Sequence, residues 1–121
     1  MTLAEAISSA DSLRPNTYPA KEKIKWLSRL DASVKAEVTD LYENAPSFEA
    51  YDENTDGDTV LLVPFPYDEI YISYLIACIH LADGEMTRYN NALVRFNDVF
   101  ESFKLWYNRT HNHVREEYHL K

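Results

Sequence analysis

The sequence predicts a mainly α-helical fold, a small helical bundle with one long antiparallel helix pair and a short β-hairpin insertion. Apolar residues recur at helical spacing in four separate segments. The 121-residue chain contains two glycines and five prolines, which favours long regular elements over loops. With 45% hydrophobic residues, a chain of this length can bury one core. We therefore expect a single helical domain over residues 1–109, with the hairpin at about 48–63 and a flexible C-terminal tail over 110–121.

Two helices are expected in the first third of the chain. Thr2 and Glu5 have the spacing of a capping box, so a short helix should run from there to Leu13 and end before Pro15. A longer helix is predicted over residues 18–43, because its apolar residues follow three- and four-residue steps. These residues are Ile24, Leu27, Leu30, Val34, Val38 and Leu41.

The hairpin is predicted from the residues that follow an acidic segment. Residues 59–63 are β-branched and apolar, and they are bounded by Gly57 and Pro64, which is a strand signal. We expect residues 48–51 to pair with them across the Asp56-Gly57 turn. A two-stranded hairpin is only marginally stable alone, so it should pack against the helices.

The two remaining helices are expected over residues 67–82 and 85–108, antiparallel across Gly84. The first is apolar around most of its circumference, which is typical of a central helix. The second has large apolar residues in a heptad pattern, which should pack on the first. The heptad residues are Met86, Tyr89, Leu93, Phe96, Phe100, Phe103 and Tyr107.

Composition and charge exclude several classes of protein. The net charge of −8 repels phosphates, so general nucleic-acid binding is not expected. The apolar stretch over residues 70–82 is too short to span a bilayer, and the N-terminus lacks the apolar region of a signal peptide. Cys78 is the single cysteine, so an intramolecular disulfide is impossible and a reducing compartment fits. We expect a soluble, intracellular protein.

The acidic segment over residues 52–58 matches the first half of a calcium-binding loop. It places oxygen ligands at alternate positions, followed by a turn glycine. However, the position that should supply the closing glutamate is Val63, and the residues around it read as a strand. A solvated turn is the alternative that we favour, and no metal is expected. The candidate ligands are Asp52, Asn54, Asp56 and Asp58.

No catalytic site is predicted. Cys78 and His80 lie two positions apart on a predicted helix, so their side chains do not face each other. We interpret the cysteine as a buried inert thiol and His80 as a partly exposed helix residue. The tail histidines His111, His113 and His119 have no cysteine or scaffold to join them into a metal site. We therefore expect a protein that is not an enzyme and that needs no cofactor.

Aromatic residues are more numerous than a small core needs, which points to protein interaction surfaces. We expect Trp26 and Trp106 to contact a partner. In the tail, Arg115 can pair with acids, and apolar residues recur at alternating or four-residue spacing. The expected tail contacts are Val114, Arg115, Tyr118 and Leu120. The surplus aromatics are Tyr18, Trp26, Tyr42, Tyr51, Tyr67, Tyr71, Trp106 and Tyr118.

Several stretches resemble a family of phage proteins. They are Leu13-Arg14-Pro15-Asn16, Lys25-Trp26-Leu27, the run from Leu61 to Tyr71, Tyr74-Leu75, Ala82-Asp83-Gly84-Glu85, Arg88-Tyr89-Asn90-Asn91, Phe96-Asn97 to Phe103, and Trp106-Tyr107. Over residues 10–108 the chain resembles the helical head–tail connector adaptors, or head-completion proteins, of siphophages and prophages of Gram-positive bacteria. The acidic segment 52–58 is longer and more charged than that pattern, so no role is transferred to it.

The resemblance implies a structural virion protein without active-site residues. Such adaptors form a homo-oligomeric ring of about a dozen copies beneath the portal. The implied partners are the portal protein and the tail or stopper proteins, with no membrane and no sequence-specific nucleic acid. The implied location is the virion neck, after assembly in the bacterial cytoplasm. Two alternatives remain open: a divalent-cation-binding module built on the acidic segment, and an accessory phage protein that binds a host protein.

Overall fold

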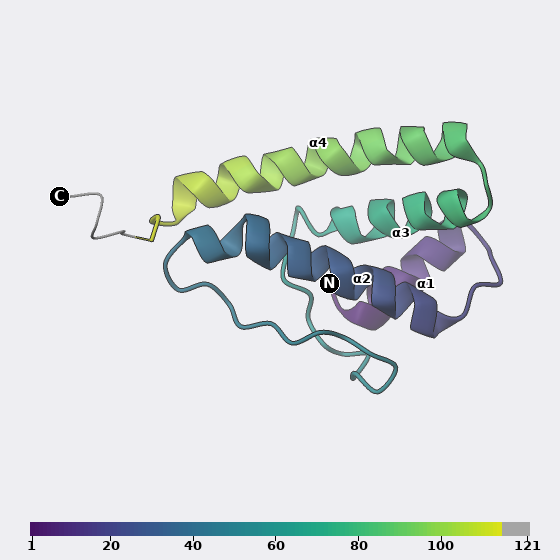
Figure 1. The fold of residues 1–121 in the computed structure, drawn as a ribbon, viewed down its shortest axis with the longest axis horizontal. Coiled ribbons are helices and arrows are strands. Elements are labelled where there is room, and N and C mark those ends of the chain that lie inside the picture. The colour runs from purple at the N-terminus through teal and green to yellow at the C-terminus, as the bar shows by residue number, and fades with distance from the viewer. Residues whose placement is uncertain (115–121) are drawn as a thin grey trace.

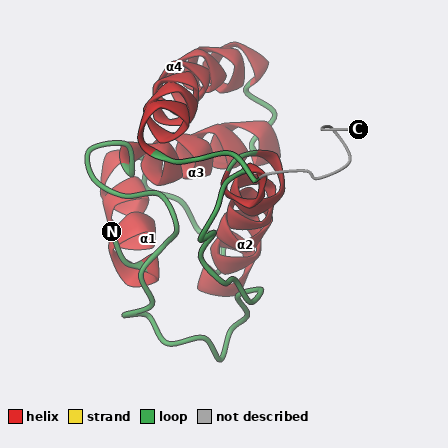
Figure 2. Cartoon of the chain, turned by 90° about the vertical axis from the view of Figure 1, so that its left-hand side faces the viewer, coloured by secondary structure: helices red, strands yellow, loops and turns green. Residues whose placement is uncertain are grey.

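A computed structural model describes residues 1–114, which form four α-helices arranged in three layers (Figure 1). The helix α4 forms one layer, α3 lies in the middle, and α1 and α2 lie side by side on the other face of α3 (Figures 1 and 2). The predicted helical bundle is confirmed, with α3 as its central helix. The helices are α1 (Leu3–Leu13), α2 (Ala20–Glu37), α3 (Glu69–Ala82) and α4 (Met86–Thr110), and a 3-10 turn, η1 (Thr39–Leu41), follows α2.

The antiparallel pair of α3 and α4 turns at Gly84. Its φ of 76° lies in the left-handed region, which suits a residue without Cβ, and its N–H donates to the Leu81 carbonyl at 3.0 Å. The C-terminal part of the predicted heptad is buried, whereas Met86 at its start is exposed. The heptad prediction therefore holds for one half of α4. The buried members are Phe96, Phe100, Phe103 and Tyr107.

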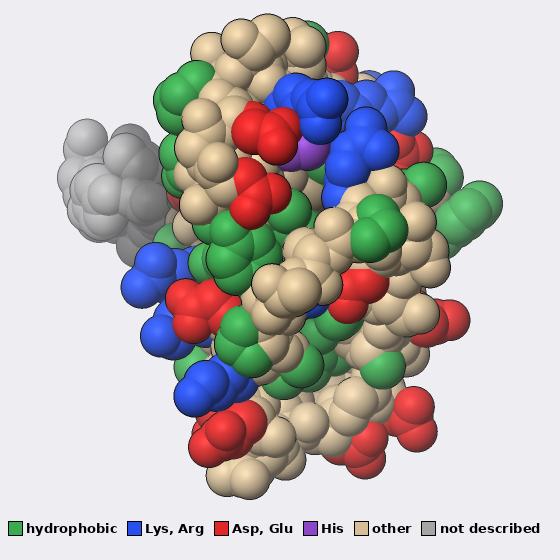
Figure 3. Space-filling view, turned by 90° about the vertical axis from the view of Figure 1, so that its right-hand side faces the viewer, with side chains coloured by type: hydrophobic (Ala, Val, Ile, Leu, Met, Phe, Trp, Pro, Cys, Tyr) green, Lys and Arg blue, Asp and Glu red, His purple; other side chains and the backbone are tan. Residues whose placement is uncertain are grey.

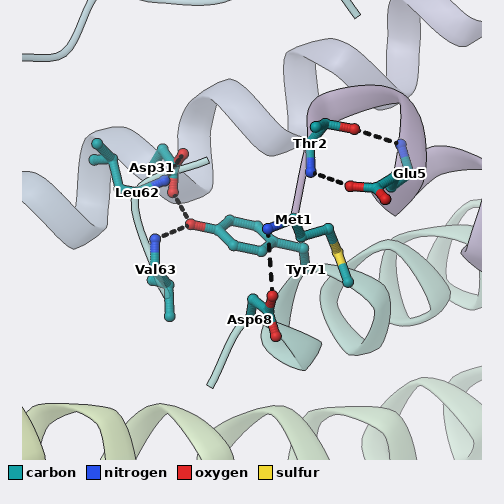
Figure 4. A network of polar contacts seen from close by, with 8 residues as sticks. All are labelled: Met1, Thr2, Glu5, Asp31, Leu62, Val63, Asp68 and Tyr71. Atoms are coloured by element: carbon teal, nitrogen blue, oxygen red, sulfur yellow. Dashed lines mark hydrogen bonds and ion pairs between the residues drawn. The ribbon is translucent and has the colours of Figure 1, made fainter. Parts of the chain in front are cut away.

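The predicted capping box at the N-terminus is confirmed. The Glu5 N–H donates to Thr2 Oγ1 at 3.1 Å, and the Thr2 N–H donates to Glu5 Oε1 at 2.8 Å (Figure 4). Hydrogen bonding to the Thr2 backbone and hydroxyl lowers the pKa of Glu5, so this carboxylate accepts as an anion at the positive end of α1.

The predicted β-hairpin is wrong, because residues 1–114 contain no β-strand (Figure 2). Residues 57–61 bond to the chain's own N-terminal residues instead. The Leu3 N–H donates to the Thr59 carbonyl at 2.9 Å, and the Ala4 N–H donates to Gly57 at 3.0 Å. First-turn N–H groups of a helix have no partner inside the helix, so these carbonyls satisfy donors that a hairpin would leave open. Residues 48–51 pack against α2 rather than against 59–63, through a bond from the Tyr51 N–H to Ser28 Oγ at 2.9 Å.

The second helix and the C-terminal segment also differ from the expected boundaries. The helix α2 ends at Glu37, before the 3-10 turn. Residues 111–114 then bond to the last residue of this turn and to a residue that follows it. The Glu43 N–H donates to the Asn112 carbonyl at 2.8 Å, and the Val114 N–H donates to Leu41 at 3.0 Å. The bonded backbone thus continues past the expected boundary at residue 109, and residues 115–121 lie outside the described part of the chain.

Candidate functional site

The acidic segment does not form a cation cage in the described structure. The Asp52 carboxylate accepts the Asn54 N–H at 2.8 Å, and the Asp56 carboxylate accepts the Asp58 N–H at 2.8 Å. Both side chains therefore stabilise their own turns. Val63, at the position where a calcium loop needs its closing carboxylate, is buried. No group of three His, Cys, Asp or Glu side chains that could hold a metal occurs among residues 1–114.

The residues expected to bind partners differ in how exposed their side chains are. Trp26 is half-buried and lies edge-on to Tyr18, with 6.2 Å between the ring centroids. Trp106 is half-buried among aromatic rings at the C-terminal end of α4, 5.5 Å from the Tyr67 ring centroid. Val114 is exposed. The other three expected contacts lie outside the described residues; they are Arg115, Tyr118 and Leu120.

The expected outward-facing aromatics include two core residues. Tyr42 and Tyr71 are buried, so part of the aromatic surplus packs the interior. Tyr42 contacts the Tyr107 ring at 5.1 Å between centroids and the His113 ring at 4.5 Å. The His111 ring stacks on Tyr107 at 3.7 Å. These contacts explain why residues 111–114 follow the surface of the bundle.

The environment of Cys78 on α3 disfavours the thiolate form of its side chain. Cys78 is half-buried, and burial raises the pKa of its thiol to about 11, so the nucleophilic thiolate is scarce at neutral pH. The expectation that His80 is partly exposed is wrong. It is 5% exposed, because α3 is covered on both faces by the other layers.

A buried carboxylate, Asp31, is the most connected polar group that the structure describes. Its side chain is fully buried on α2, and it accepts three hydrogen bonds. The Tyr51 hydroxyl donates to Oδ2 at 2.6 Å, and the Tyr71 hydroxyl donates to Oδ1 at 2.6 Å. The Leu62 N–H donates to Oδ2 at 3.1 Å. One side chain therefore connects α2, α3 and the long segment between η1 and α3 (Figure 4).

The pKa shifts in this cluster favour protonated tyrosine hydroxyls that donate to the Asp31 carboxyl group. Burial raises the pKa of Asp31, although the three donors oppose the shift. Burial and the nearby Asp31 carboxylate raise the pKa of both Tyr51 and Tyr71, so both phenols remain protonated donors. The Tyr71 oxygen also accepts the Val63 N–H at 2.7 Å. All of these groups are satisfied within the cluster, so its role is to hold the fold together.

Sequence reasoning missed Asp31, although a signal was present. Asp31 follows Leu27 by four positions and precedes Val34 by three, so it falls on the apolar stripe of its helix. A carboxylate on an apolar stripe is buried with that stripe and needs donors. Its tyrosine donors lie far away in the sequence, so their identity was not readable from local spacing.

A polar pocket lies at the end of the bundle that holds the turn between α3 and α4. It is lined from three helices, with Arg14 after α1, His80 on α3, and Arg88 and Asn91 on α4. Figure 3 shows this end of the molecule, where a histidine lies beside Lys and Arg side chains. The apolar lining is formed by Ile76 and Ala92.

Large apolar side chains are exposed at several places in the described chain, among them the helix α4 and the loop before α3. On α4, Val94 is 61% exposed and Leu105 is 58% exposed. They lie about three helical turns apart at about 3.6 residues per turn, so they share the side of α4 that faces away from α3. Phe65, between two prolines before α3, is 83% exposed.

In comparisons with known proteins, no protein-family model, no curated protein and no solved structure matched this chain. Among the helices formed by residues 1–114, none combines the length and the apolar character needed to cross a membrane.

Proposed function

We propose that this chain is a structural assembly protein of a tailed phage, the adaptor that joins portal to tail in the virion neck. The observation that supports the proposal best is the outer face of α4. The helix α4 is the longest helix of the described chain, and it buries one face on α3. On the opposite face, Val94 and Leu105 are exposed. Exposed apolar residues on a rigid helix favour a protein contact over chemistry. The sequence resemblance to connector adaptors favours a portal or tail protein as the partner in that contact.

An adaptor needs separate contact surfaces for the portal and for the tail, besides the contacts between its own copies. Val94 and Leu105 on α4, and Phe65 in the loop before α3, are exposed apolar side chains at two separate places on one subunit. Asp98 and Glu101 are exposed between Val94 and Leu105 on the same side of α4, which agrees with a partner that is protein rather than DNA. Portal and tail proteins are the partners that the resemblance implies.

Co-sedimentation with purified portal protein tests this proposal. The full chain should pellet with portal, and Val94→Asp combined with Leu105→Asp should weaken that binding, because two charges would enter an apolar contact. Ala32→Asp combined with Ala36→Asp is the matched control, since it adds the same charge to exposed positions of α2. If the full chain does not bind portal protein from its own gene cluster, the adaptor proposal is wrong. Equal losses in both variants would instead assign the effect to net charge and not to α4.

The role of the C-terminal tail can be tested with a truncated chain, and the structure decides where the chain should end. A chain that ends at Asn108 would lose the His111 stack and the backbone bonds of residues 112–114. A chain that ends at Val114 keeps them, so it tests residues 115–121 alone. If these residues anchor the subunit, the shorter chain binds portal more weakly; equal binding excludes the tail as the anchor.

A further inference from the structure

The pocket between Arg14, His80 and Arg88 contains an unsatisfied buried donor or acceptor. His80 is 5% exposed, and its Nδ1 has no hydrogen-bond partner among residues 1–114. The nearest carboxylate oxygen, Glu85 Oε2, is 3.9 Å away, which is beyond hydrogen-bond length. Buried polar atoms are nearly always paired in folded proteins, so an unpaired one in a pocket wall indicates a missing partner.

The other polar groups of the pocket define the chemistry of that partner. Arg14 and Arg88 bring two guanidinium groups, and Asn91 adds an amide. Arg88 is 3.1 Å from Glu85 Oε2, and the same oxygen is 3.9 Å from His80 Nδ1, so this one acid at the edge of the pocket already balances part of its charge. Guanidinium groups bind carboxylates and phosphates through paired, charge-assisted hydrogen bonds. The pocket is therefore suited to an oxyanion.

The same protein carries an acidic segment with unused carboxylates. Glu53 and Asp58 are exposed, and their side chains form no hydrogen bond or ion pair within the described residues, unlike Asp52 and Asp56, which stabilise the turns. Gly57 lies beside Ala4, near the start of α1, whereas Arg14 follows its end. The helix is 11 residues long, about 16 Å at about 1.5 Å per residue, so the pocket and the acidic segment lie at opposite ends of it.

We propose that the pocket lined by Arg14, His80 and Arg88 binds a carboxylate from residues 52–58 of a second copy of this chain. The contact joins two different surfaces, so it is head-to-tail, the geometry that closes a ring. The part of this inference that concerns ring closure rests on the proposed function. It also places a local positive site against a local negative one in a protein whose net charge of −8 otherwise keeps copies apart.

The first test measures the pocket alone, with a peptide of residues 50–60 added to the full chain. The ring resonances of His80, followed by NMR, should shift to saturation. Arg14→Ala and Arg88→Ala should each weaken binding about tenfold, as loss of a charge-assisted hydrogen bond requires. Arg109→Ala, at the other end of α4, is the matched control and should leave the affinity unchanged. A peptide with Glu53→Gln and Asp58→Asn should not bind.

A second arm of this test uses inorganic phosphate in place of the peptide. The proposal is overturned if phosphate saturates the His80 shift while the peptide does not, since the site would then take a free oxyanion. It is also overturned if the peptide shift does not saturate, or if it survives in both arginine variants.

The second test examines assembly on the portal by exchanging charges. Arg88→Glu alone and Asp58→Arg alone should each lose ring formation, because each creates a contact between like charges. An equal mixture of the two variants should regain it, because each altered pocket then meets an oppositely charged segment. If Arg88→Glu alone still forms rings, this pocket is not the contact and the adaptor function stands. If the unaltered chain forms no ring, the adaptor function fails, and the peptide test alone decides the pocket.

Discussion

The Tyr71 hydroxyl lies 2.6 Å from Asp31 Oδ1, and this hydrogen bond joins the central helix α3 to α2 in the interior of the bundle. The two residues are 40 positions apart in the sequence. Because Asp31 also accepts from Tyr51 and Leu62, it fixes the long irregular segment between η1 and α3 onto the helices. The segment has no strand to hold it within the described chain, so this cluster holds it in place together with the backbone hydrogen bonds of residues 57–61 to the N-terminal residues.

Removal of the Asp31 carboxylate should destabilise the protein strongly. Asp31→Ala leaves two buried hydroxyls and one N–H without their acceptor, which should lower the free energy of unfolding by about 3 kcal/mol or more. Urea unfolding measures this change. Asp40→Ala is the control, since Asp40 forms an exposed ion pair with Lys35 at 2.8 Å and should cost about 1 kcal/mol or less. Equal losses in the two variants would mean that the cluster contributes no more than a surface pair.

The raised pKa of Asp31 predicts a specific pH dependence of stability. A carboxyl group whose pKa is higher in the folded protein than in the unfolded chain stabilises the fold fully below the unfolded value, about 3.9, and loses that contribution as pH rises through the folded value. Asp31→Asn does not titrate. The stability of the wild type relative to Asp31→Asn should therefore increase as pH falls from about 7 to about 4. Urea titrations of both proteins across this range give the difference, and a decrease on acidification would show that the three donors lower this pKa instead.

Phe103 should be a major contributor to the packing of α4. It is fully buried and contacts Tyr67, Phe100, Trp106 and Tyr107. Phe103→Ala should cost about 3–5 kcal/mol, because it removes a large side chain and leaves a cavity. Thermal melts should show this loss, whereas Leu105→Ala, on the exposed face of the same helix, should change stability by about 0.5 kcal/mol or less. A melting temperature close to that of the wild type would place Phe103 on an interface rather than in the core.

Calcium should not stabilise the isolated protein. The carboxylates of Asp52 and Asp56 already bond to the backbone of their own turns, and Val63 replaces the closing acid. Calcium at about 1 mM should therefore leave the melting temperature unchanged, with magnesium as the comparison. A rise of several degrees that Asp52→Ala abolishes would support the cation-binding alternative.

Features set by neighbouring residues were predictable from the sequence. Thr2 and Glu5 define the first cap within four residues, and Gly84 marks the turn between α3 and α4. The helical class followed from the spacing of apolar residues, which depends on the chain alone. The heptad pattern predicted burial correctly from Phe96 to Tyr107, where the helix packs on a partner. It predicted burial wrongly for Met86, which is exposed at the start of α4.

Features set by distant partners were not predictable. The apolar run 59–63 fits a strand locally, but the open N–H groups of Leu3 and Ala4 compete for its carbonyl groups. His80 was expected to be partly exposed because it is polar, although the apolar circumference of its helix had already predicted a central position for α3. The polar pocket joins residues from three helices, and only the packing of those helices brings Arg14 near Arg88.

The most direct measurement of the proposed function is electron microscopy of purified portal rings after incubation with the full chain. We expect an additional coaxial ring of density on one face of the portal, with about a dozen copies of a helical subunit. The long axis of α4 should be recognisable in each copy, with Val94 and Leu105 in contact with the portal. Portal rings that show no added density at saturating concentrations of the chain would contradict the adaptor function.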